Sequence, residues 1–367
     1  MQLVYENKQS ENQILARAQN IPPLSLEGDL SLLFFGDNFY ALSALLNKGY
    51  REKIDLIYID PPYNTQQIFT VSENRVSTIS RSNNGATAYE DNRSLPEYLE
   101  FMRERLILMR ELLSPCGSIY VHIDNKVGHY LKILLDEIFG AENFKNDIAR
   151  VKSNPKNFSR RAFGNEKDVV LFYAKNAKKN IFNQITIPLT DNDKIEMFQK
   201  TDEYGRRYNT VPVHAPGETQ NGETGGMWRG MLPPKGRHWR SPPNELDKLD
   251  EQGLLEWSKN GVPRIKKFAD EHKGKKIQDI WRYKDPAYPI YPTEKNAEML
   301  EMIIQQSSNP NSIVLDCFAG SGSTLLAAQN LNRRWIGMDT SSVAIQTIRD
   351  RFGLLPFQFV NLENILR

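Results

Sequence analysis

The amino-acid sequence predicts an α/β fold in which a doubly wound, largely parallel sheet is interrupted by a long insertion. Short apolar runs alternate with segments of helical spacing near both ends of the chain, as in parallel strands joined by crossover helices. From about residue 176 this periodicity gives way to turns rich in Gly, Pro, Asn and Asp. One split sheet explains both halves more economically than two small sheets, since neither half alone has many strands.

The first half of the chain begins with strands and helices in alternation. Its first apolar run ends at Gly36-Asp37-Asn38, and the second is broken by two prolines. Ser94 is of a type that caps helices, and an amphipathic segment follows it. The expected elements are strands at 31–35, 54–60, 118–124, 147–151 and 169–173, with helices after the first strand, at 94–113 and at 127–139.

Regular units return after the insertion. A helix is expected at 293–306, a strand at 312–316, a helix from residue 323, a strand at 335–339 and a last helix. A further stretch, 64–93, is polar and long for a connection in a compact domain, and loops of that length are often functional lids. We therefore expect this stretch to be a mobile flap beside the functional site of the protein.

The composition is that of an ordinary globular protein. The chain has 367 residues, of which 40% are hydrophobic and 25% charged, so collagen-like, coiled-coil and wholly disordered proteins are excluded. Its two cysteines, Cys116 and Cys317, are far apart, which excludes a disulfide scaffold and a four-cysteine zinc site. No stretch approaches the roughly 18 apolar residues of a membrane span, and the N-terminus lacks the pattern of a signal peptide. We expect a cytoplasmic protein without a membrane segment and without a metal.

The charges are segregated along the chain. Residues 145–284 hold 28 Lys and Arg against 18 Asp and Glu, whereas the rest of the chain holds 19 against 27. A basic middle segment between acidic flanks suggests that one region binds a polyanion while the other has a different task. Basic faces are common, so this signal alone is as compatible with a solvated surface as with nucleic-acid binding.

A strand that ends in an acid and runs into a glycine turn is typical of a nucleotide-binding corner. The run 315–324 reads LDCFAGSGST, and its Gly320 and Gly322 let backbone N–H groups and a ligand approach closely. The next strand ends at Asp339, where a carboxylate could hold both hydroxyls of a ribose. The third glycine of a dinucleotide fingerprint and the lysine of a Walker loop are missing, so an adenosine ligand without a diphosphate fits better. The alternative is that the glycines serve only a tight corner.

The most specific element is the tetrapeptide Asp60-Pro61-Pro62-Tyr63 at the carboxyl end of an apolar strand, where open α/β sheets bind ligands. The prolines fix φ at about −65° and lack an N–H, so the Pro61 carbonyl can point outward. An Asp oxygen and that carbonyl can accept both hydrogens of a planar exocyclic amine and expose its lone pair to an electrophilic methyl. Tyr63 offers a face on which a base can stack. The alternative is a strand simply ended by prolines and an aromatic residue.

These two motifs resemble motif IV and motif I of the S-adenosylmethionine-dependent amino-methyltransferases of DNA. The catalytic motif precedes the cofactor motif, an order that resembles the β group of that family, which includes modification subunits of type III restriction systems and shorter relatives. The similarity covers about 30–175 and 281–352. It implies a Rossmann-like methyltransferase fold, circularly permuted, with an inserted target-recognition domain. The expected domains are the first part of the methyltransferase domain at 1–175, the target-recognition domain at 176–284 and the second part of the methyltransferase domain at 285–367.

The resemblance also assigns roles to individual residues. Asp37 is expected to bond the cofactor adenine and Asp339 its ribose, while the turn 318–322 holds the methionine part. Thr293 and Lys295 are expected to line the same pocket. The expected catalytic residues are Asp60, Pro61, Pro62 and Tyr63, and the expected cofactor-binding residues are Asp37, Asn38, Thr293, Lys295, Asp316, Phe318, Ala319, Gly320, Ser321, Gly322 and Asp339.

The implied activity is that of a site-specific DNA methyltransferase that uses S-adenosylmethionine, within a restriction-modification system. Asp rather than Ser at the start of the tetrapeptide favours adenine N6 as the target over cytosine N4, which stays the alternative. The base would flip out of the duplex and receive the methyl group directly. An RNA or protein-amide methyltransferase is a further alternative, which the basic insertion disfavours. A catalytically silent DNA-binding module is disfavoured by the intact motifs, and an NAD-dependent oxidoreductase by the missing glycine. Double-stranded DNA is the expected partner, and the resemblance alone adds a partner endonuclease and a homodimer.

Sequence recognition is expected in the insertion, where basic residues occur beside Trp228 and Trp239. Arginine suits bidentate contact with guanine, but at least half of protein–DNA hydrogen bonds go to the backbone, so most of these side chains would position the duplex. Two other patterns are set aside: 241–244 resembles a cytosine-type tetrapeptide but follows no apolar strand, and His122 is a single strand-end histidine, a type that is more often structural. The expected DNA-contacting residues are Arg206, Arg207, Arg229, Lys235, Arg237 and Arg240.

Overall fold

The computed structural model separates into two compact units. One is formed by Met1–Ile185 with Gln278–Arg367, and the other by Thr186–Ile277. The second unit lies within the insertion expected at 176–284. The structure describes residues 2–26, 30–62, 68–72, 75–76, 86–90, 93–153, 161, 163–219, 221–286, 289, 291 and 294–364.

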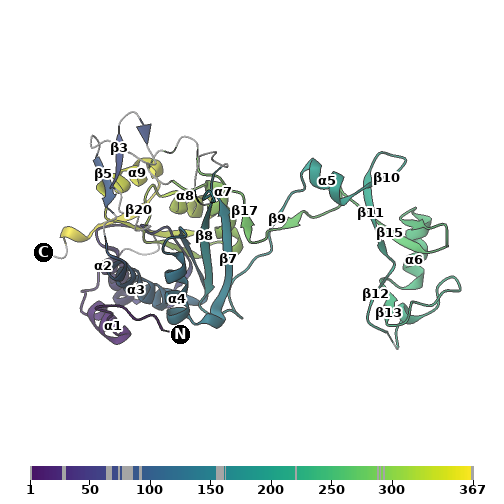
Figure 1. Ribbon diagram of the computed structural model, residues 1–367, viewed down its shortest axis with the longest axis horizontal. Helices are drawn as coiled ribbons and strands as arrows, with labels where there is room; N and C mark the ends of the chain where they lie inside the picture. The colour runs from purple at the N-terminus through teal and green to yellow at the C-terminus, as the bar shows by residue number, and fades with distance from the viewer. Residues whose placement is uncertain are drawn as a thin grey trace. The chain divides into compact units, whose positions relative to one another are not determined.

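The larger unit is built around a nine-stranded sheet (Figure 1). Its strands are β1 (Ser31–Phe35), β2 (Ile54–Ile59), β6 (Leu113–Ile123), β7 (Phe144–Val151), β8 (Lys167–Ala174), β17 (Ile280–Trp281), β18 (Ile313–Asp316), β19 (Arg334–Asp339) and β20 (Phe357–Asn361). Their order across the sheet is β17-β7-β8-β6-β2-β18-β19-β1-β20. All neighbours are parallel except β8, which is antiparallel to both β6 and β7. The predicted α/β class and its split sheet are confirmed.

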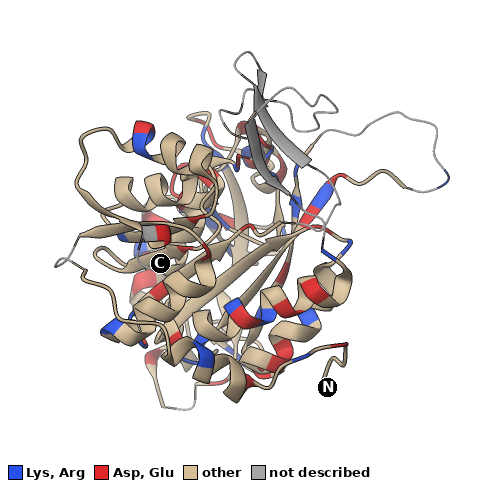
Figure 2. Cartoon of the chain, turned by 90° about the vertical axis from the view of Figure 1, so that its left-hand side faces the viewer, with Lys and Arg blue, Asp and Glu red and all other residues tan. Residues whose placement is uncertain are grey.

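Helices cover both faces of this sheet (Figure 1; Figure 2). One face carries α1 (Glu11–Gln19), α2 (Asn38–Leu45), α3 (Leu95–Leu112) and α4 (Gly128–Phe139), and the other carries α7 (Ala297–Ser307), α8 (Ser323–Asn330) and α9 (Ser342–Phe352). Figure 2 shows acidic and basic residues interspersed along these helices. Within the described part of the chain, no helix has the length and apolar character needed to cross a membrane.

The longest helix, α3, shows how local sequence sets these elements. Ser94 begins it with a capping box, in which its N–H and its hydroxyl donate to the Glu97 carboxylate at 2.9 and 2.7 Å. Apolar residues then recur every three or four positions and are fully buried, which fixes one face of the helix against the sheet. These residues are Tyr98, Met102, Leu106 and Met109.

The site is positioned by four neighbouring parallel strands, β2, β18, β19 and β1. Parallel strands end at the same edge of a sheet, so the acids that end or closely follow them, Asp60, Asp316, Asp339 and Asp37, share that edge. The connection after β2 leads to α3 on one face, whereas β18 leads directly to α8 on the other. Such a switch of faces opens a crevice between the carboxyl ends of adjacent strands.

Part of the stretch expected to be a flap is regular. Strands β3 (Ile68–Ser72), β4 (Arg75–Val76) and β5 (Ala86–Glu90) form a three-stranded antiparallel sheet. The sequence analysis did not predict these strands, because polar residues dominate the segment. The rest of 63–92, and with it the predicted mobility, lies outside the described residues.

The smaller unit has an antiparallel sheet and a core of its own. Its strands β10 (Lys200–Thr201), β11 (Arg207–Pro212), β14 (Leu255–Trp257) and β15 (Pro263–Phe268) form one sheet in the order β10-β11-β15-β14, and β12 (His214–Pro216) pairs with β13 (Arg237–Trp239). Two further elements are α5 (Asp191–Met197) and α6 (Pro243–Glu251). Trp228 and Trp239, expected beside the basic residues, are buried in the core with Val213, Leu246, Leu255 and Ile265.

Gly322 is required at the corner between β18 and α8. Its φ is 76°, and an added Cβ would lie 2.7 Å from Ile348 Cγ1 of α9. We expect Gly322→Ala to lower the free energy of unfolding by about 2–4 kcal/mol, because a left-handed conformation and an overpacked contact add together. Urea denaturation measures the change. Gly49→Ala is the control, since Gly49 also has a positive φ but open space around it, and should lose only about 1 kcal/mol. Equal losses in the two variants would contradict the packing argument.

Candidate active site

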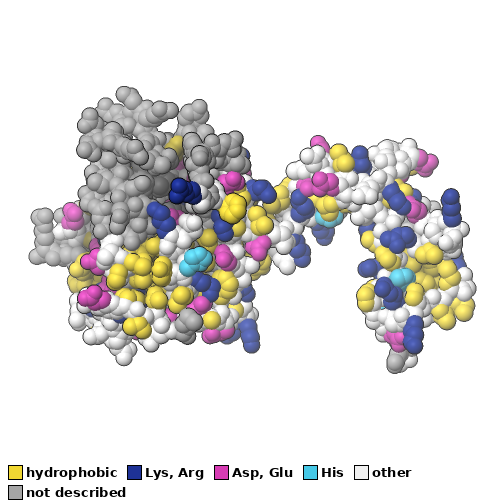
Figure 3. All heavy atoms as spheres, viewed as in Figure 1, with side chains coloured by type: hydrophobic (Ala, Val, Ile, Leu, Met, Phe, Trp, Pro, Cys, Tyr) yellow, Lys and Arg dark blue, Asp and Glu magenta, His cyan; other side chains and the backbone are white. Residues whose placement is uncertain are grey.

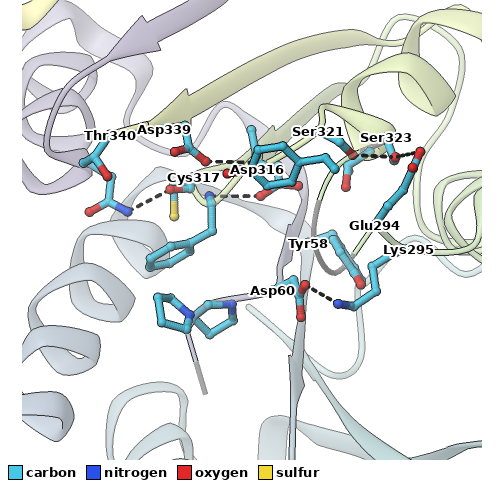
Figure 4. A pocket seen from close by; sticks show the side chains of 18 of the residues that line it. Tyr58, Asp60, Glu294, Lys295, Asp316, Cys317, Ser321, Ser323, Asp339 and Thr340 are labelled. Carbon is cyan, nitrogen blue, oxygen red and sulfur yellow. Dashed lines mark hydrogen bonds and ion pairs between the residues drawn. The ribbon is translucent and has the colours of Figure 1, made fainter. Parts of the chain in front are cut away.

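A pocket opens at the carboxyl edge of the central strands, and both halves of the larger unit line it (Figure 4). Its volume is about 260 Å³, many times what one water molecule needs, so it can take a small organic ligand. The predicted residues in its lining are Asp37, Asn38, Asp60, Pro61, Pro62, Lys295, Asp316, Phe318, Ala319, Gly320, Ser321 and Asp339.

Three predicted residues are not in that lining. Gly322 faces Ile348 instead, and Tyr63 and Thr293 lie outside the described residues. Ten lining residues were not predicted for the site, most of them because they are apolar or because only the fold brings them near. They are Tyr58, Arg93, Phe101, Tyr291, Glu294, Leu300, Cys317, Ser323, Thr324 and Thr340.

Asp60 directly follows β2, where the two prolines end the strand because neither can donate a ladder hydrogen bond. Its carboxylate forms an ion pair with Lys295, 235 residues further along the chain, and both side chains are largely buried (Figure 4). A predicted catalytic residue is therefore in direct contact with a predicted cofactor residue. A carboxylate has about four acceptor positions, so Asp60 can accept other hydrogen bonds beside that of Lys295.

Asp37 and Asn38, at the start of α2, are held by the buried Arg105 of α3. Arg105 Nη2 lies 2.8 and 3.0 Å from the two carboxylate oxygens of Asp37, and its Nε donates to Asn38 Oδ1. Asn38 in turn donates to the backbone carbonyl of Cys317 at 2.7 Å. The turn after β1 is thus tied to the turn after β18. Arg105 was not predicted, because its place within an amphipathic helix gives no sign of this role.

Asp316 and Asp339 brace the glycine corner. Asp339 accepts the N–H groups of Gly320 and Ser341, both at 2.8 Å, and Asp316 accepts the N–H of Phe318 at 3.0 Å. Burial raises the pKa of both carboxyl groups, and for Asp316, which also lies near other carboxylates, the pKa reaches about 7. Asp339, predicted to hold a ribose, therefore also fixes the backbone that would hold the rest of the ligand.

Hydroxyl groups and an ion pair border the same corner. Glu294 pairs with Arg351 of α9, and the Ser323 hydroxyl lies 3.4 Å from Glu294 Oε1 and 2.8 Å from Arg351 Nη1. The hydroxyls of Ser321 and Ser323 are 3.0 Å apart. The corner therefore offers the pocket hydroxyl groups whose positions are set by a neighbouring ion pair.

His122 belongs to a network of buried, hydrogen-bonded side chains that reaches the pocket at Tyr58. Its Nδ1 lies 2.8 Å from the hydroxyl of Tyr58, a residue that lines the pocket, and its Nε2 lies 3.4 Å from Asp168 Oδ2. Burial lowers the pKa of His122, whereas His122 and Lys152 hold the pKa of Asp168 below its usual range despite burial. An ionised carboxylate can only accept, so Nε2 carries the proton and Nδ1 accepts from Tyr58.

The network continues to the edge of the sheet. Arg150 of β7 and Lys152 contact Asp168 at 3.4 and 2.5 Å. Arg150 also donates to the carbonyl of Tyr283 at 2.8 Å and forms an ion pair with Asp285. The sequence analysis gave His122 no role, since these partners come from strands far apart in the sequence. The only available sign was that His122 and Asp60 end neighbouring strands.

The predicted DNA-contacting residues divide into two groups. Arg206 and Arg229 are committed to carboxylates within the smaller unit: Arg206 pairs with Asp270 and Glu271, and Arg229 pairs with Asp247 and Asp250. The second group has no ion-pair partner within the described residues; it consists of Arg207, Lys235, Arg237 and Arg240. Figure 3 shows Lys and Arg side chains spread over the visible face of this unit.

Arg237 and Arg240 are exposed on and beside the β12–β13 hairpin. Arg237 Nη1 lies 3.2 Å from His214 Nδ1, and Arg240 Nε donates to the Pro212 carbonyl at 2.9 Å. Burial, followed by the charges of Arg237, Arg240 and Arg264, lowers the pKa of His214. Among the described residues no carboxylate forms an ion pair with Arg237 or Arg240, so both guanidinium groups are exposed without a counter-charge in contact with them.

The chain matches the N6_N4_Mtase family model, described as a DNA methylase, over residues 54–350. The chain belongs to this family of DNA methylases. The Type II methyltransferase M.EcaI of Enterobacter cloacae is 45% identical over 329 residues, which are 87% of this chain and 69% of that protein. The Mod subunit of the type III restriction-modification enzyme StyLTI of Salmonella typhimurium is 26% identical over 381 residues, covering 92% of this chain and 56% of the subunit. The methylase thus spans little more than half the length of that relative.

Solved structures are similar to the methylase over most of its length. A crystal structure of the M1.HpyAVI–SAM complex matches with a TM-score of 0.45 and 20% identity, covering 87% of this chain and 99% of that one. PvuII DNA methyltransferase, described as cytosine-N4-specific, matches with a TM-score of 0.44 and 15% identity, covering 90% and 95%.

The buried His122 makes the stability of the methylase depend on pH. Its pKa is lowered in the folded protein, so below about pH 6.5 the unfolded chain binds a proton that the native chain does not. Stability contributed by neutral His122 is therefore present above that pH and is lost as the pH falls. We expect His122→Gln to flatten the pH dependence between pH 6.5 and 5, by up to about 1.4 kcal/mol per pH unit, in urea denaturation. The exposed His129 on α4 provides the control His129→Gln, which should keep the wild-type slope. An unchanged slope in His122→Gln would contradict the assignment.

Proposed function

We propose that this methylase transfers the methyl group of S-adenosylmethionine to N6 of adenine in duplex DNA, as the modification enzyme of a restriction-modification system. The observation that carries the proposal is that Asp60 to Pro62 and the corner 318–321 line one pocket, although they are far apart in sequence. In such a pocket a carboxylate can bind the target amine while the glycine corner binds a nucleoside. This arrangement suits the transfer of a group between two bound molecules.

The pocket residues fit S-adenosylmethionine. The backbone around Gly320 is held open by a positive φ and by Asp339, and Phe101 and Phe318 add apolar surface. Acidic side chains suit a ligand that carries positive charge. When bound there, S-adenosylmethionine supplies a methyl group activated by its sulfonium. In this arrangement Asp37 faces the adenine, Asp339 the ribose, and 318–321 the methionine part.

Asp60 and the Pro61 carbonyl are the proposed acceptors for the two hydrogens of the target amine. The ion pair with Lys295 holds the Asp60 carboxylate in one orientation, which removes rotamer freedom that the reaction would otherwise have to restrict. Hydrogen bonds that strengthen as the amine nitrogen becomes tetrahedral stabilise the transition state more than the ground state. Tyr63 is the proposed stacking platform for the flipped base.

Adenine is proposed over cytosine because the tetrapeptide begins with Asp rather than Ser. The family covers both amine targets, so cytosine N4 is the second candidate and an outcome of the test below. The restriction-modification setting is supported by the relatives, which include a Type II methyltransferase and a type III Mod subunit. A partner endonuclease and a homodimer belong to the same proposal through the likeness to Mod subunits.

The smaller unit is the proposed target-recognition domain, with boundaries at Thr186–Ile277 rather than at the wider limits expected from the sequence. Its hairpin residues Arg237 and Arg240 are the favoured DNA contacts, because no carboxylate within the described residues neutralises them. Arg206 and Arg229 are less suited, since a phosphate would have to compete with carboxylates already bound to them.

Asp60→Asn tests the catalytic proposal. The variant keeps the size of the side chain but loses the charge that polarises the amine, so we expect the single-turnover methylation rate to fall about 10²- to 10³-fold while S-adenosylmethionine still binds. Labelled S-adenosylmethionine, assorted duplexes and nucleoside analysis of the digested product provide the measurement. Asp147→Asn, at an exposed position of β7, is the matched control and should methylate at the wild-type rate.

The same digest identifies the target base. N6-methyladenine supports the proposal, and N4-methylcytosine would replace it with the second candidate. A rate for Asp60→Asn within a fewfold of wild type would remove Asp60 from catalysis, whichever base is methylated.

Arg237→Ala tests the DNA-binding surface. Loss of one phosphate contact should weaken binding to all duplexes and reduce the slope of log K against log salt by about 1. Fluorescence anisotropy over a range of salt concentrations measures both effects. Arg229→Ala is the matched control: its guanidinium serves Asp247 and Asp250, so the slope should stay at the wild-type value. An unchanged slope for Arg237→Ala would take this residue out of the interface.

A further inference from the structure

Four acids stand in a row at the carboxyl ends of β2, β18, β19 and β1, and each has different partners. Asp60 pairs with Lys295, and Asp37 pairs with Arg105. Asp339 accepts two backbone N–H groups. Asp316 accepts one backbone N–H and a hydrogen bond from the Thr324 side chain, and within the described part of the chain no Lys or Arg pairs with it.

Asp316 is the acid whose charge the protein compensates least. It is 2% exposed, and its strand lies between the strands that lead to Asp60 and Asp339, so carboxylates flank it on both sides. Removing a carboxylate from water without a cation or several donors is unfavourable, and nearby negative charges add to the penalty. Yet Asp316 lines the pocket, where a ligand can reach it.

We propose that Asp316 distinguishes the positively charged methyl donor from the neutral product of the reaction, and that binding of the donor expels a proton from Asp316. The inference rests on the cofactor named under the proposed function, and it holds whichever base is methylated. S-adenosylmethionine carries a sulfonium, whereas S-adenosylhomocysteine has the same nucleoside and amino-acid groups around an uncharged sulfur. Both ligands carry the same α-ammonium and carboxylate, so the donor differs from the product by one positive charge, at the sulfur.

The charge of Asp316 follows the reaction. Transfer breaks the bond between sulfur and the methyl carbon, and sulfur keeps the electron pair. The target nitrogen forms the new bond and loses one proton to solvent. The sulfur is then neutral, so the reason for Asp316 to stay ionised is gone and it takes up a proton from solvent. A pocket that favours the donor over the product in this way also weakens its hold on the product once transfer is complete.

Neighbouring groups set the pH range of this exchange. Burial, with the Asp60 and Asp339 carboxylates, raises the pKa of Asp316 to about 7, so near neutral pH the ligand-free protein holds a fraction of a proton there. The other charged and titratable groups around the pocket come from several elements. They are Asp37 before α2, Tyr58 of β2, Arg93 before α3, Arg105 of α3, Tyr291, Glu294 and Lys295 before α7, and Cys317 after β18.

Calorimetric titration of the intact protein at pH 7 tests the proposal. Titrations in two buffers with different ionisation enthalpies give the number of protons released per S-adenosylmethionine and per S-adenosylhomocysteine bound. Wild type should release more protons with the donor than with the product, because the raised pKa of Asp316 leaves a fraction of a proton on its carboxyl group at that pH. Each ligand brings the same α-amino group to wild type and to Asp316→Asn, so any proton that this group exchanges cancels when the two proteins are compared.

Asp316→Asn should abolish the part of the proton difference that comes from residue 316. It should also reduce the preference for the donor about tenfold, since each unit by which the donor lowers the pKa of Asp316 corresponds to a factor of 10 in affinity. Asp147→Asn, exposed and outside the pocket, should behave as wild type. An equal proton difference in wild type and Asp316→Asn would overturn the proposal, as would a donor preference that the substitution leaves unchanged. Wild-type protein that binds neither ligand would instead contradict the proposed function itself.

Unfolding without ligand gives a second test. A raised pKa means that the native chain holds a proton which the unfolded chain loses between about pH 3.8 and 7, so wild-type stability falls as the pH rises through that window. Asp316→Asn lacks this fall and should melt at a higher temperature than wild type at pH 8, with a smaller advantage at pH 5. A variant that is less stable than wild type at pH 8 would show that Asp316 is not under-compensated and would overturn the proposal.

Discussion

The parallel pairing of β2 with β18 is the contact on which the site depends. Val314 lies opposite Leu56 and Leu315 opposite Ile57, so two segments from distant parts of the chain end at the same edge. Parallel neighbours cannot be joined by a tight turn, and the connection between these two strands contains α3, β6, α4 and the whole smaller unit. Once the pair forms, Asp60 and the glycine corner share one crevice, and their order along the chain is of no geometric consequence. The adjacency lets the methyltransferase fold form although the tetrapeptide precedes the glycine corner in the sequence.

Local patterns in the sequence predicted most of the larger unit. Apolar runs located β1, β2 and β18, and the Ser94 cap located α3, because strands buried on both faces and capped amphipathic helices leave strong short-range signals. Weak signals explain the omissions. β17 has two residues, β20 mixes apolar residues with Gln358 and Asn361, and polar residues alternate in the strands of the smaller unit. Their pairing is decided by tertiary contacts that no short window of sequence contains.

The same distinction applies to the site. Residues at strand ends, such as Asp60, Asp316 and Asp339, could be predicted because the edge of a parallel sheet is where ligands bind. Their partners could not, because Lys295, Arg105 and the others reach them through the fold. Trp228 and Trp239 show the reverse case: aromatic residues beside arginines suggested a DNA surface, whereas the smaller unit needs them for its own core. A small antiparallel sheet with few apolar residues has little else to bury.

One buried chain of polar groups also explains how the insertion is accommodated. The chain leaves the sheet after β8 and returns as β17, and both strands flank β7, so the insertion begins and ends at one edge. Arg150 of β7 binds the Tyr283 carbonyl and Asp285 just after that return, and the same guanidinium contacts Asp168. Asp168 orients His122, and His122 accepts from Tyr58 at the pocket. Buried charges persist only when they are paired and hydrogen-bonded. One network of hydrogen bonds therefore connects Tyr283 and Asp285, where the polypeptide returns from the insertion, with Tyr58 in the lining of the pocket.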